Sequence, residues 1–240
     1  MKKLVVDVCL SPKLYPTYHR EDTIVVVTDV LRATSAMCAA FENGVEKMIP
    51  VASVEEATEY KKKGFIVGAE RNGIPLEGFD FGNSPYSYMT EKIKGETVVI
   101  STTNGTQAID VSRDAYKVVI GAFTNITALC DWLKSQKKHV LILCSGWKYR
   151  FNMEDTLFAG AVSEILLKDK ETYKYGDGAL SSMYLYQSAK SKPYQFLKNS
   201  SHATRLSEMG LKKDIRYCLA YDKTSVIPIL EGKYLVKLDT

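Results

Sequence analysis

Short runs of β-branched and other apolar residues alternate with amphipathic stretches along the first two thirds of the chain, and this alternation constrains the fold most strongly. The runs are LVVDV (4–8), TIVVV (23–27), KMIPV (47–51), FIVG (65–68), TVVIS (97–101), KVVIG (117–121) and HVLILC (139–144). Strands that alternate with helices are typical of a layered α/β/α protein with a mostly parallel or mixed central sheet. We therefore predict this fold class.

Helix signals lie between the runs. Apolar residues at helical spacing fill 33–41, and Gly44 follows as a stop signal. Ser53 and Glu56 form a capping-box pattern ahead of a second helix. Asp155 precedes a third helical segment, TLFAGAVSEILLK. The alternation of strands and helices is therefore supported by local start and stop signals.

The last third of the chain is richer in Tyr, Lys and Ser, with helical patterns over about 178–220. It ends in SVIPILEGKYLVKL (225–238), which is typical of a hairpin at the edge of a sheet. We expect a single compact domain over 1–240. Its motif-bearing core would span 1–168, and 169–240 would add C-terminal helices and the terminal hairpin.

Composition excludes several classes of protein and partner. Hydrophobic residues make up 45% and charged residues 25% of 240, which is ordinary for a globular protein. No apolar run reaches the roughly 18 residues of a membrane span, and the start of the chain lacks a secretion signal. The net charge is only +4, without a basic face, so no nucleic-acid partner is expected. Five cysteines without CxxC spacing favour a reducing, cytoplasmic location, and a homodimer is possible on general grounds.

Polar residues follow four of the apolar runs. In an open α/β sheet, ligands bind beyond the carboxyl ends of the strands, where loops meet helix N-termini. The polar segments are TDVLRATS (28–35), AERNG (69–73), TTNGT (102–106), and SGW (145–147) followed by EDT (154–156). We expect these segments to converge on one site.

Three carboxylates in these segments are candidate metal ligands: Asp29, Glu70 and Asp155. They offer the hard oxygens that Mg²⁺ takes, commonly one or two carboxylates together with substrate phosphate and water. Arg32 and Arg71 can hold a phosphate or carboxylate through two parallel hydrogen bonds. Asp29, Arg32 and Arg71 are therefore the predicted catalytic residues.

Backbone amides, hydroxyls and side-chain amides complete the predicted pocket. A helix that opens at TTNGT would present free N–H groups to an anion. The predicted substrate-binding residues are Asn72, Thr103, Asn104, Gly105, Thr106, Ser145 and Gly146. A cation beside arginines suits a small, multiply negative phosphate ester as substrate.

Simpler interpretations remain open for single residues. Asp155 could be only a helix N-cap, and Glu70 with Arg71 could be a surface ion pair. Residues 69–95 form a long loop of the kind that is usually functional or disordered, and function is favoured here. Within it, Asp80 could merely brace the loop. The three histidines, including His202, have no second metal ligand nearby in sequence and need no function.

Two other functions are open alternatives. Cys144 and Arg150 fit the C-x₅-R pattern of cysteine phosphatases, in which a thiolate attacks the phosphate held by the arginine. The loop between them has a single glycine and leads into no evident helix, so the thiol is more readily interpreted as packed and inert. The second alternative is a non-catalytic binding protein for an anionic metabolite.

With these residues in place, the chain resembles the 2-phosphosulfolactate phosphatase family. The matching segments are DVLRATS (29–35), GAERNG (68–73), GFDFGNSP (78–85), TTNGT (102–106), CSGW (144–147) and EDTL (154–157). They occur in the order of the family and span nearly two thirds of the chain. Phe158 departs from the small residue or cysteine expected there.

The resemblance implies a Mg²⁺-dependent phosphatase that hydrolyses (2R)-2-phospho-3-sulfolactate to 3-sulfolactate and phosphate, a reaction known from coenzyme M biosynthesis. Related 2-hydroxy-acid phosphates are possible substrates. We expect phosphoryl transfer driven by positioning and charge neutralisation. Water is favoured over Asp29 as the nucleophile, because Leu31 stands where a dehalogenase-type phosphatase would place a second Asp.

Overall fold

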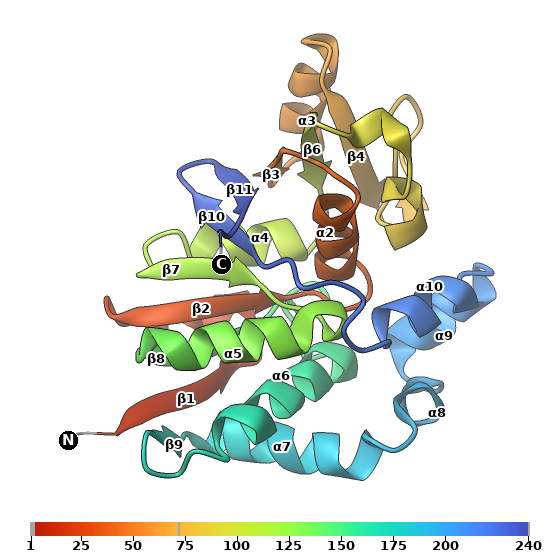
Figure 1. Ribbon diagram of the computed structural model, residues 1–240. Helices are drawn as coiled ribbons and strands as arrows, with labels where there is room; N and C mark the ends of the chain where they lie inside the picture. The colour runs from red at the N-terminus through yellow and green to blue at the C-terminus, as the bar shows by residue number, and fades with distance from the viewer. Residues whose placement is uncertain (1–2, 72, 240) are drawn as a thin grey trace.

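The computed structural model describes residues 3–71 and 73–239. Within these ranges, eleven strands form one sheet in the order β5-β4-β6-β3-β11-β10-β7-β2-β8-β1-β9 (Figure 1). The strands are β1 (Leu4–Cys9), β2 (Thr23–Thr28), β3 (Lys47–Val51), β4 (Ile66–Arg71), β5 (Ile74–Pro75), β6 (Thr97–Ser101), β7 (Lys117–Ile120), β8 (His139–Cys144), β9 (Tyr173–Tyr175), β10 (Pro228–Glu231) and β11 (Tyr234–Lys237).

The helices are α1 (Tyr15–Tyr18), α2 (Ala33–Glu42), α3 (Val54–Lys62), α4 (Gly105–Val111), α5 (Ile126–Gln136), α6 (Met153–Leu166), α7 (Asp177–Ala189), α8 (Pro193–Leu197), α9 (Ser201–Glu208) and α10 (Lys212–Cys218). Short 3₁₀ turns lie at η1 (Pro12–Leu14), η2 (Pro85–Tyr88), η3 (Glu91–Ile93) and η4 (Phe123–Asn125). The layered α/β fold class is confirmed.

The apolar runs form strands because both faces of the sheet are covered. Every residue of β2 is buried, as expected for a central parallel strand between two helical layers. Ile24 and Val26 pack in the core beneath α5 and α6, whereas Val25 and Val27 pack in the core beneath α2 and α4. Each of the seven predicted runs is a strand, and among residues 3–71 and 73–239 only the two short strands β5 and β9 were not predicted.

The terminal hairpin is central in the sheet, and the prediction of an edge hairpin was wrong. β10 pairs antiparallel with β7, and β11 pairs antiparallel with β3. Ile229 and Leu235 of the hairpin are buried. The hairpin therefore joins a parallel group of β4, β6 and β3 to a parallel group of β7, β2, β8, β1 and β9, and the two groups run in opposite directions.

Carboxyl ends from both groups nevertheless meet, because β3, β4 and β6 are turned steeply relative to β1, β2 and β8 (Figure 1). The C-terminal helices α9 and α10 lie beside this meeting point, next to α2 and α6 in the same view. The expected division at residue 168 stays a prediction. No helix within 3–71 and 73–239 combines the length and apolar character needed to cross a bilayer.

Candidate active site

A narrow cavity lies where the two groups of strands meet. Its lining comes from the ends of β2, β4, β6 and β8, from the long loop after β4, and from α9. The lining residues are Asp29, Leu31, Arg32, Glu70, Gly73, Asn83, Thr102, Thr103, Asn104, Trp147 and His202. The predicted convergence of the first three polar segments is therefore observed, together with Trp147 from the fourth.

Asp29 directly follows β2 and is buried beside the start of α4. Gly105 opens that helix and donates its backbone N–H to the Asp29 carboxylate. A Cβ atom at Gly105 would lie 3.0 Å from both Asp29 Oδ2 and Ala33 Cβ, which explains why glycine opens this helix. Burial raises the pKa of Asp29 to about 6, with the carboxylates of Glu154 and Glu70 contributing to the increase and His202 opposing it. The Asp29 carboxylate is thus buried away from water and lies close to other carboxylates.

Arg32 lies between two carboxylates. Its Nη2 pairs with Glu70 Oε2, and its Nη1 donates to Asp214 Oδ2 at 2.6 Å. Nη2 also donates to the carbonyl of Gly73 at 3.2 Å. The guanidinium is therefore matched in charge within the protein, and it ties β4 and α10 to the loop after β2. The simpler interpretation of Glu70 with Arg71 as a surface ion pair is wrong, because Glu70 is buried and pairs with Arg32 instead.

The long loop after β4 is ordered by its acidic residues. Glu70 accepts the backbone N–H of Asn83 at 3.0 Å, which brings Asn83 to the cavity. Asp80 accepts Lys61 Nζ at 2.6 Å and Lys92 Nζ at 2.7 Å. Burial opposes ionisation of Asp80, but these bonds prevail and lower its pKa to about 2. The prediction that Asp80 braces the loop is confirmed.

Asp155 lies behind the cavity and holds its walls together. It accepts the backbone N–H groups of Val30 at 2.9 Å and Gly146 at 3.0 Å, and the side-chain amide of Asn152 at 2.9 Å. Burial raises the pKa of Asp155 well above its usual range, with Asp29 and Glu154 adding to the effect. The helix N-cap interpretation is wrong, because α6 begins at Met153 after Asn152.

Among residues 3–71 and 73–239, no group of three or more His, Cys, Asp or Glu side chains is arranged as a metal cage. Asp29 and Glu70 both line the cavity, whereas Asp155 does not. A Mg²⁺ ion often has only one or two protein carboxylates, so a group of three is not required to hold it. Asp29, Glu70 and Asp155 therefore stay predicted ligands of Mg²⁺.

The remaining predicted residues divide between the cavity and its surroundings. Thr103 and Asn104 line it, and Asn104 Oδ1 accepts the backbone N–H of Lys148 at 3.0 Å, which joins the loops after β6 and β8. Thr106 Oγ1 donates to the carbonyl of Thr102 at 3.0 Å and steadies the first turn of α4.

Three other predicted residues lie outside the cavity lining, and one is not described. Ser145 and Gly146 form the turn before Trp147, and Gly146 has a positive φ of 65°. Arg71 is half-buried and donates to the carbonyl of Glu70 at 2.8 Å. Asn72 lies outside the described residues.

His202 is a candidate site residue that the sequence interpretation missed. It lies on α9, lines the cavity, and its Nδ1 is 2.7 Å from Glu154 Oε1. Its ring also packs against Trp147, with centroids 5.6 Å apart. No function was assigned to His202 because no partner lies near it in sequence. Its partners Glu154 and Trp147 come from elements that are distant in the chain. Only its position on the buried side of a short amphipathic helix could have drawn attention to it.

Comparison with known proteins agrees with the motifs. The family model described as 2-phosphosulpholactate phosphatase matches residues 9–233. The chain is 39% identical over 97% of its length to a protein of Thermotoga petrophila named as a probable 2-phosphosulfolactate phosphatase, of which 99% is covered. A protein of the same name from Clostridium tetani is 36% identical, with 93% of this chain and 96% of the relative covered.

The chain belongs to the 2-phosphosulfolactate phosphatase family. The resemblance drawn from the six segments is thereby confirmed. Phe158, the departure noted in sequence, is fully buried and packs edge-to-face on Phe123 at 5.4 Å, so it belongs to the core.

The alternative of a cysteine phosphatase lacks the required geometry in this family member. Cys144 is buried, and burial raises the pKa of its thiol well above the usual range, with the charge of Asp155 adding to the shift. Arg150 is exposed. A nucleophilic cysteine needs the opposite environment, with a lowered pKa beside a bound anion.

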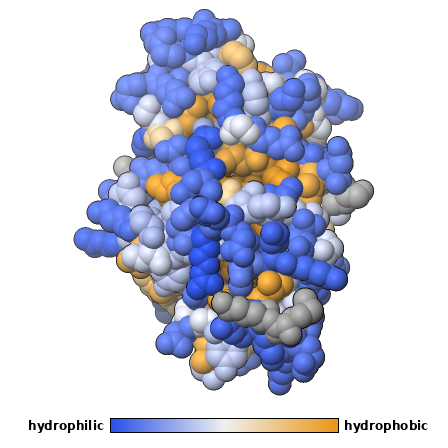
Figure 2. Space-filling model, turned by 90° about the vertical axis from the view of Figure 1, so that its left-hand side faces the viewer, coloured by the Kyte–Doolittle hydropathy of each residue, from blue (hydrophilic) through white to orange (hydrophobic). Residues whose placement is uncertain are grey.

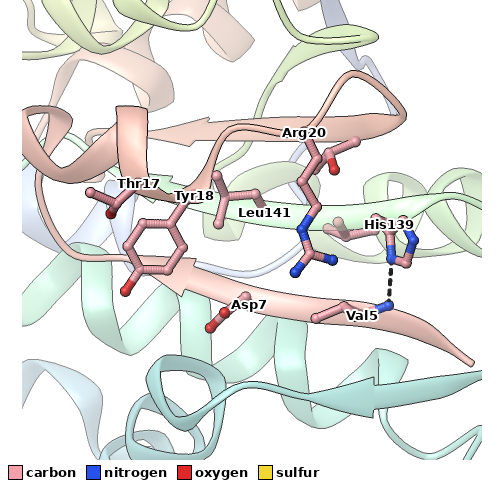
Figure 3. A pocket seen from close by; sticks show the side chains of 9 residues that line it. Val5, Asp7, Thr17, Tyr18, Arg20, His139 and Leu141 are labelled. Atoms are coloured by element: carbon pink, nitrogen blue, oxygen red, sulfur yellow. Dashed lines mark hydrogen bonds between the residues drawn. The ribbon is translucent and has the colours of Figure 1, made fainter.

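A second cavity lies on the opposite side of this phosphatase-family fold, where β2 and β8 begin (Figure 3). Arg20 and Tyr18 reach towards Asp7 on β1, and His139 Nδ1 accepts the backbone N–H of Val5 at 2.8 Å. The surrounding face is mostly hydrophilic (Figure 2). This cavity contains none of the family segments and lies away from the carboxyl ends of the strands.

Proposed function

We propose that this chain hydrolyses the phosphate ester of 2-phospho-3-sulfolactate to 3-sulfolactate and phosphate, and that the reaction requires Mg²⁺. Family membership makes the chain a phosphoric monoester hydrolase. The substrate comes from the names of its relatives, and the need for a cation is supported by the charges in the cavity.

The charge balance is the observation that carries the metal proposal. Four carboxylates, those of Asp29, Glu70, Glu154 and Asp214, lie at the cavity and its immediate surroundings, against the two guanidinium groups of Arg32 and Arg205. A site of this charge repels a substrate that carries phosphate, carboxylate and sulfonate together. A divalent cation reverses that repulsion, and metal ions in this role neutralise charge on the phosphoryl oxygens.

The available ligands fit a sparsely held Mg²⁺. Asp29 lines the cavity, and Glu154 Oε2 is buried without a hydrogen-bond partner among the described residues. Asp29, with Glu154 or Glu70, would hold the ion. When bound, Mg²⁺ polarises the phosphoryl group and lowers the charge that the nucleophile meets.

The chain's own residues position the reacting groups. Thr102, Thr103, Asn104 and Asn83 supply hydroxyl and amide groups to the same cavity. His202 is held at Nδ1 by Glu154, which leaves Nε2 to exchange a proton with the leaving hydroxyl oxygen. We propose water as the nucleophile, because Leu31 is buried and apolar where an aspartyl-phosphate mechanism would use a second carboxylate.

Phosphate release from 2-phospho-3-sulfolactate, measured with Mg²⁺ and with EDTA, tests the proposal. We expect turnover with Mg²⁺ and none with EDTA, and a loss of at least about 100-fold in D29N but not in D80N, whose carboxylate lies outside the cavity. Binding of the substrate without any phosphate release, with Mg²⁺ present, would refute the catalytic proposal. Activity that is undiminished in EDTA would refute the metal.

Acid quench of a single turnover with ³²P-labelled ester separates the two nucleophiles. Direct attack by water breaks the bond between phosphorus and the leaving oxygen in one step, so no ³²P is bound to the protein at any time. Attack by Asp29 first forms a phosphoaspartate, which would appear as acid-stable ³²P on the wild-type protein and be absent from D29N, before water attacks its phosphorus and releases phosphate.

A further inference from the structure

Arg205 carries a guanidinium whose hydrogen-bonding capacity is unused. It lies on α9, and its Cζ is 3.8 Å from the centroid of the Trp147 ring. Its Nε and Nη2 are buried and have no hydrogen-bond partner in residues 3–71 and 73–239. Buried donors are nearly always satisfied in folded proteins, and an exception requires an explanation such as an absent ligand.

Arg205 lies directly beside residues that line the cavity. It follows His202 by three residues, which places both on one side of α9. Trp147, on which it stacks, lines the cavity together with His202. Burial lowers the pKa of Arg205, while the charges of Glu154 and Glu70 raise it, so the guanidinium is close to the same carboxylates that surround the cavity.

The two arginines of this region differ in what they are free to bind. Arg32 is paired with Glu70 and Asp214. Arg205 forms no ion pair with a carboxylate among the described residues, and its plane is fixed by the Trp147 ring. A stacked, planar guanidinium with free donors is suited to an oxyanion that accepts two parallel hydrogen bonds.

We propose that Arg205 binds the non-reacting oxyanion of the substrate, either its sulfonate or its carboxylate, and thereby selects phosphate esters that carry a further negative group. This inference rests on the proposed function and makes Arg205 a specificity-determining residue. Trp147 holds the guanidinium in place, and α9 brings it to the cavity.

Steady-state kinetics of R205M and R205K test this inference. The matched control is R216M, because Arg216 on α10 also stacks on an aromatic ring, that of Tyr194, at 4.8 Å, but is exposed, and Tyr194, unlike Trp147, is not part of the cavity lining. The substrates are 2-phospho-3-sulfolactate, 2-phospholactate, which lacks the sulfonate, 2-phosphooxypropane-1-sulfonate, which lacks the carboxylate, and isopropyl phosphate, which lacks both.

For 2-phospho-3-sulfolactate, we expect kcat/KM to fall roughly 10- to 100-fold in R205M, mainly through KM, and to fall less in R205K. R216M should match the wild type. The R205M effect should disappear on 2-phospholactate if Arg205 binds the sulfonate, and on 2-phosphooxypropane-1-sulfonate if it binds the carboxylate. Either pattern supports the inference, because a merely structural role would lower turnover of all substrates alike.

An equal loss on every substrate that the wild type turns over, or no loss on any, overturns the inference. If R205M fails to fold in circular dichroism, R205K decides, because it keeps the charge and must still show a loss confined to substrates with the bound group. If the wild type is active and R205M and R205K have the same kcat/KM as the wild type, only this inference is overturned. A wild type that releases phosphate from none of the esters overturns the proposed function, and this inference with it.

Discussion

Replacing Asp29 by asparagine should make the metal-free protein more stable at pH 8 while it abolishes phosphate release. The pKa of Asp29 is raised from 3.8 to about 6, first by burial and then by the carboxylates of Glu154 and Glu70. A carboxyl group whose pKa is higher in the folded state stabilises the fold below the unfolded value and loses that contribution as pH rises through the folded value. The buried, ionised Asp29 therefore lowers the unfolding free energy at pH 8 but not at pH 4.

The size of the penalty follows from the shift. A change from 3.8 to about 6 corresponds to about 3 kcal/mol of unfolding free energy, at about 1.4 kcal/mol for each tenfold change in proton affinity. Asparagine carries no charge and keeps one oxygen to accept the N–H of Gly105. We therefore expect D29N to exceed the wild type by about 2–3 kcal/mol at pH 8 in EDTA and to equal it within about 0.5 kcal/mol near pH 4.

Urea denaturation in EDTA at pH 4, 6 and 8, monitored by circular dichroism, measures these differences. Adding Mg²⁺ at 100 times its dissociation constant should stabilise the wild type by about 2.7 kcal/mol and leave D29N unchanged. A D29N protein that is less stable than the wild type at pH 8, or a difference that does not vary with pH, would show that the electrostatic account of Asp29 is incorrect.

Three further variants probe the walls of the site and the fold. D80N should have an unfolding free energy about 1 kcal/mol lower than the wild type at pH 7, because the pKa of Asp80 is lowered to about 2 in the folded protein, and the partly exposed lysine partners reduce the effect. This difference should vanish as the pH falls from about 4 through 2. A lower stability of D80N that persists in urea denaturation at pH 2 would contradict this account. C144A should keep kcat and KM within about twofold, with the same sensitivity to EDTA, and a folded but inactive C144A would restore the cysteine mechanism. G160A should lower the unfolding free energy by at least about 2 kcal/mol in urea denaturation, because the added Cβ would meet the backbone carbonyl of Ser182 where α6 packs on α7. An unchanged denaturation midpoint would show that this contact is loose.

Strands and helices in the first two thirds of the chain could be predicted because their signals are local. A run such as TIVVV is apolar on both faces, and Ser53 accepts the backbone N–H of Glu56 at 3.1 Å as its capping pattern indicates. The central place of the terminal hairpin is a non-local property. Its residues alternate like those of an edge strand, and only their pairing with β3 and β7 shows that they fill the gap between two parallel groups.

The same distinction separates the parts of the site that were predicted from those that were not. Asp29, Glu70, Thr103 and Asn104 could be found because a polar residue at or just after the end of a buried strand has few places to lie other than the carboxyl edge. His202 lies on a short helix whose sequence resembles an ordinary surface helix. Nothing near it in the chain shows that Glu154, 48 residues earlier, will be its partner.

The C-terminal third is therefore part of the site, and Arg32 explains how it is attached. One guanidinium contacts Glu70 at the end of β4 and Asp214 on α10, so the side chain that follows β2 fixes both the long loop and the last helices. Removing Arg32 would leave two buried carboxylates facing each other, a loss of about 3–5 kcal/mol by comparison with other buried pairs. Because α9 precedes α10 by only a short turn, the same attachment sets the position of His202 and Arg205. A residue that the sequence presents as a binder of substrate thus also holds together the walls against which the substrate would bind.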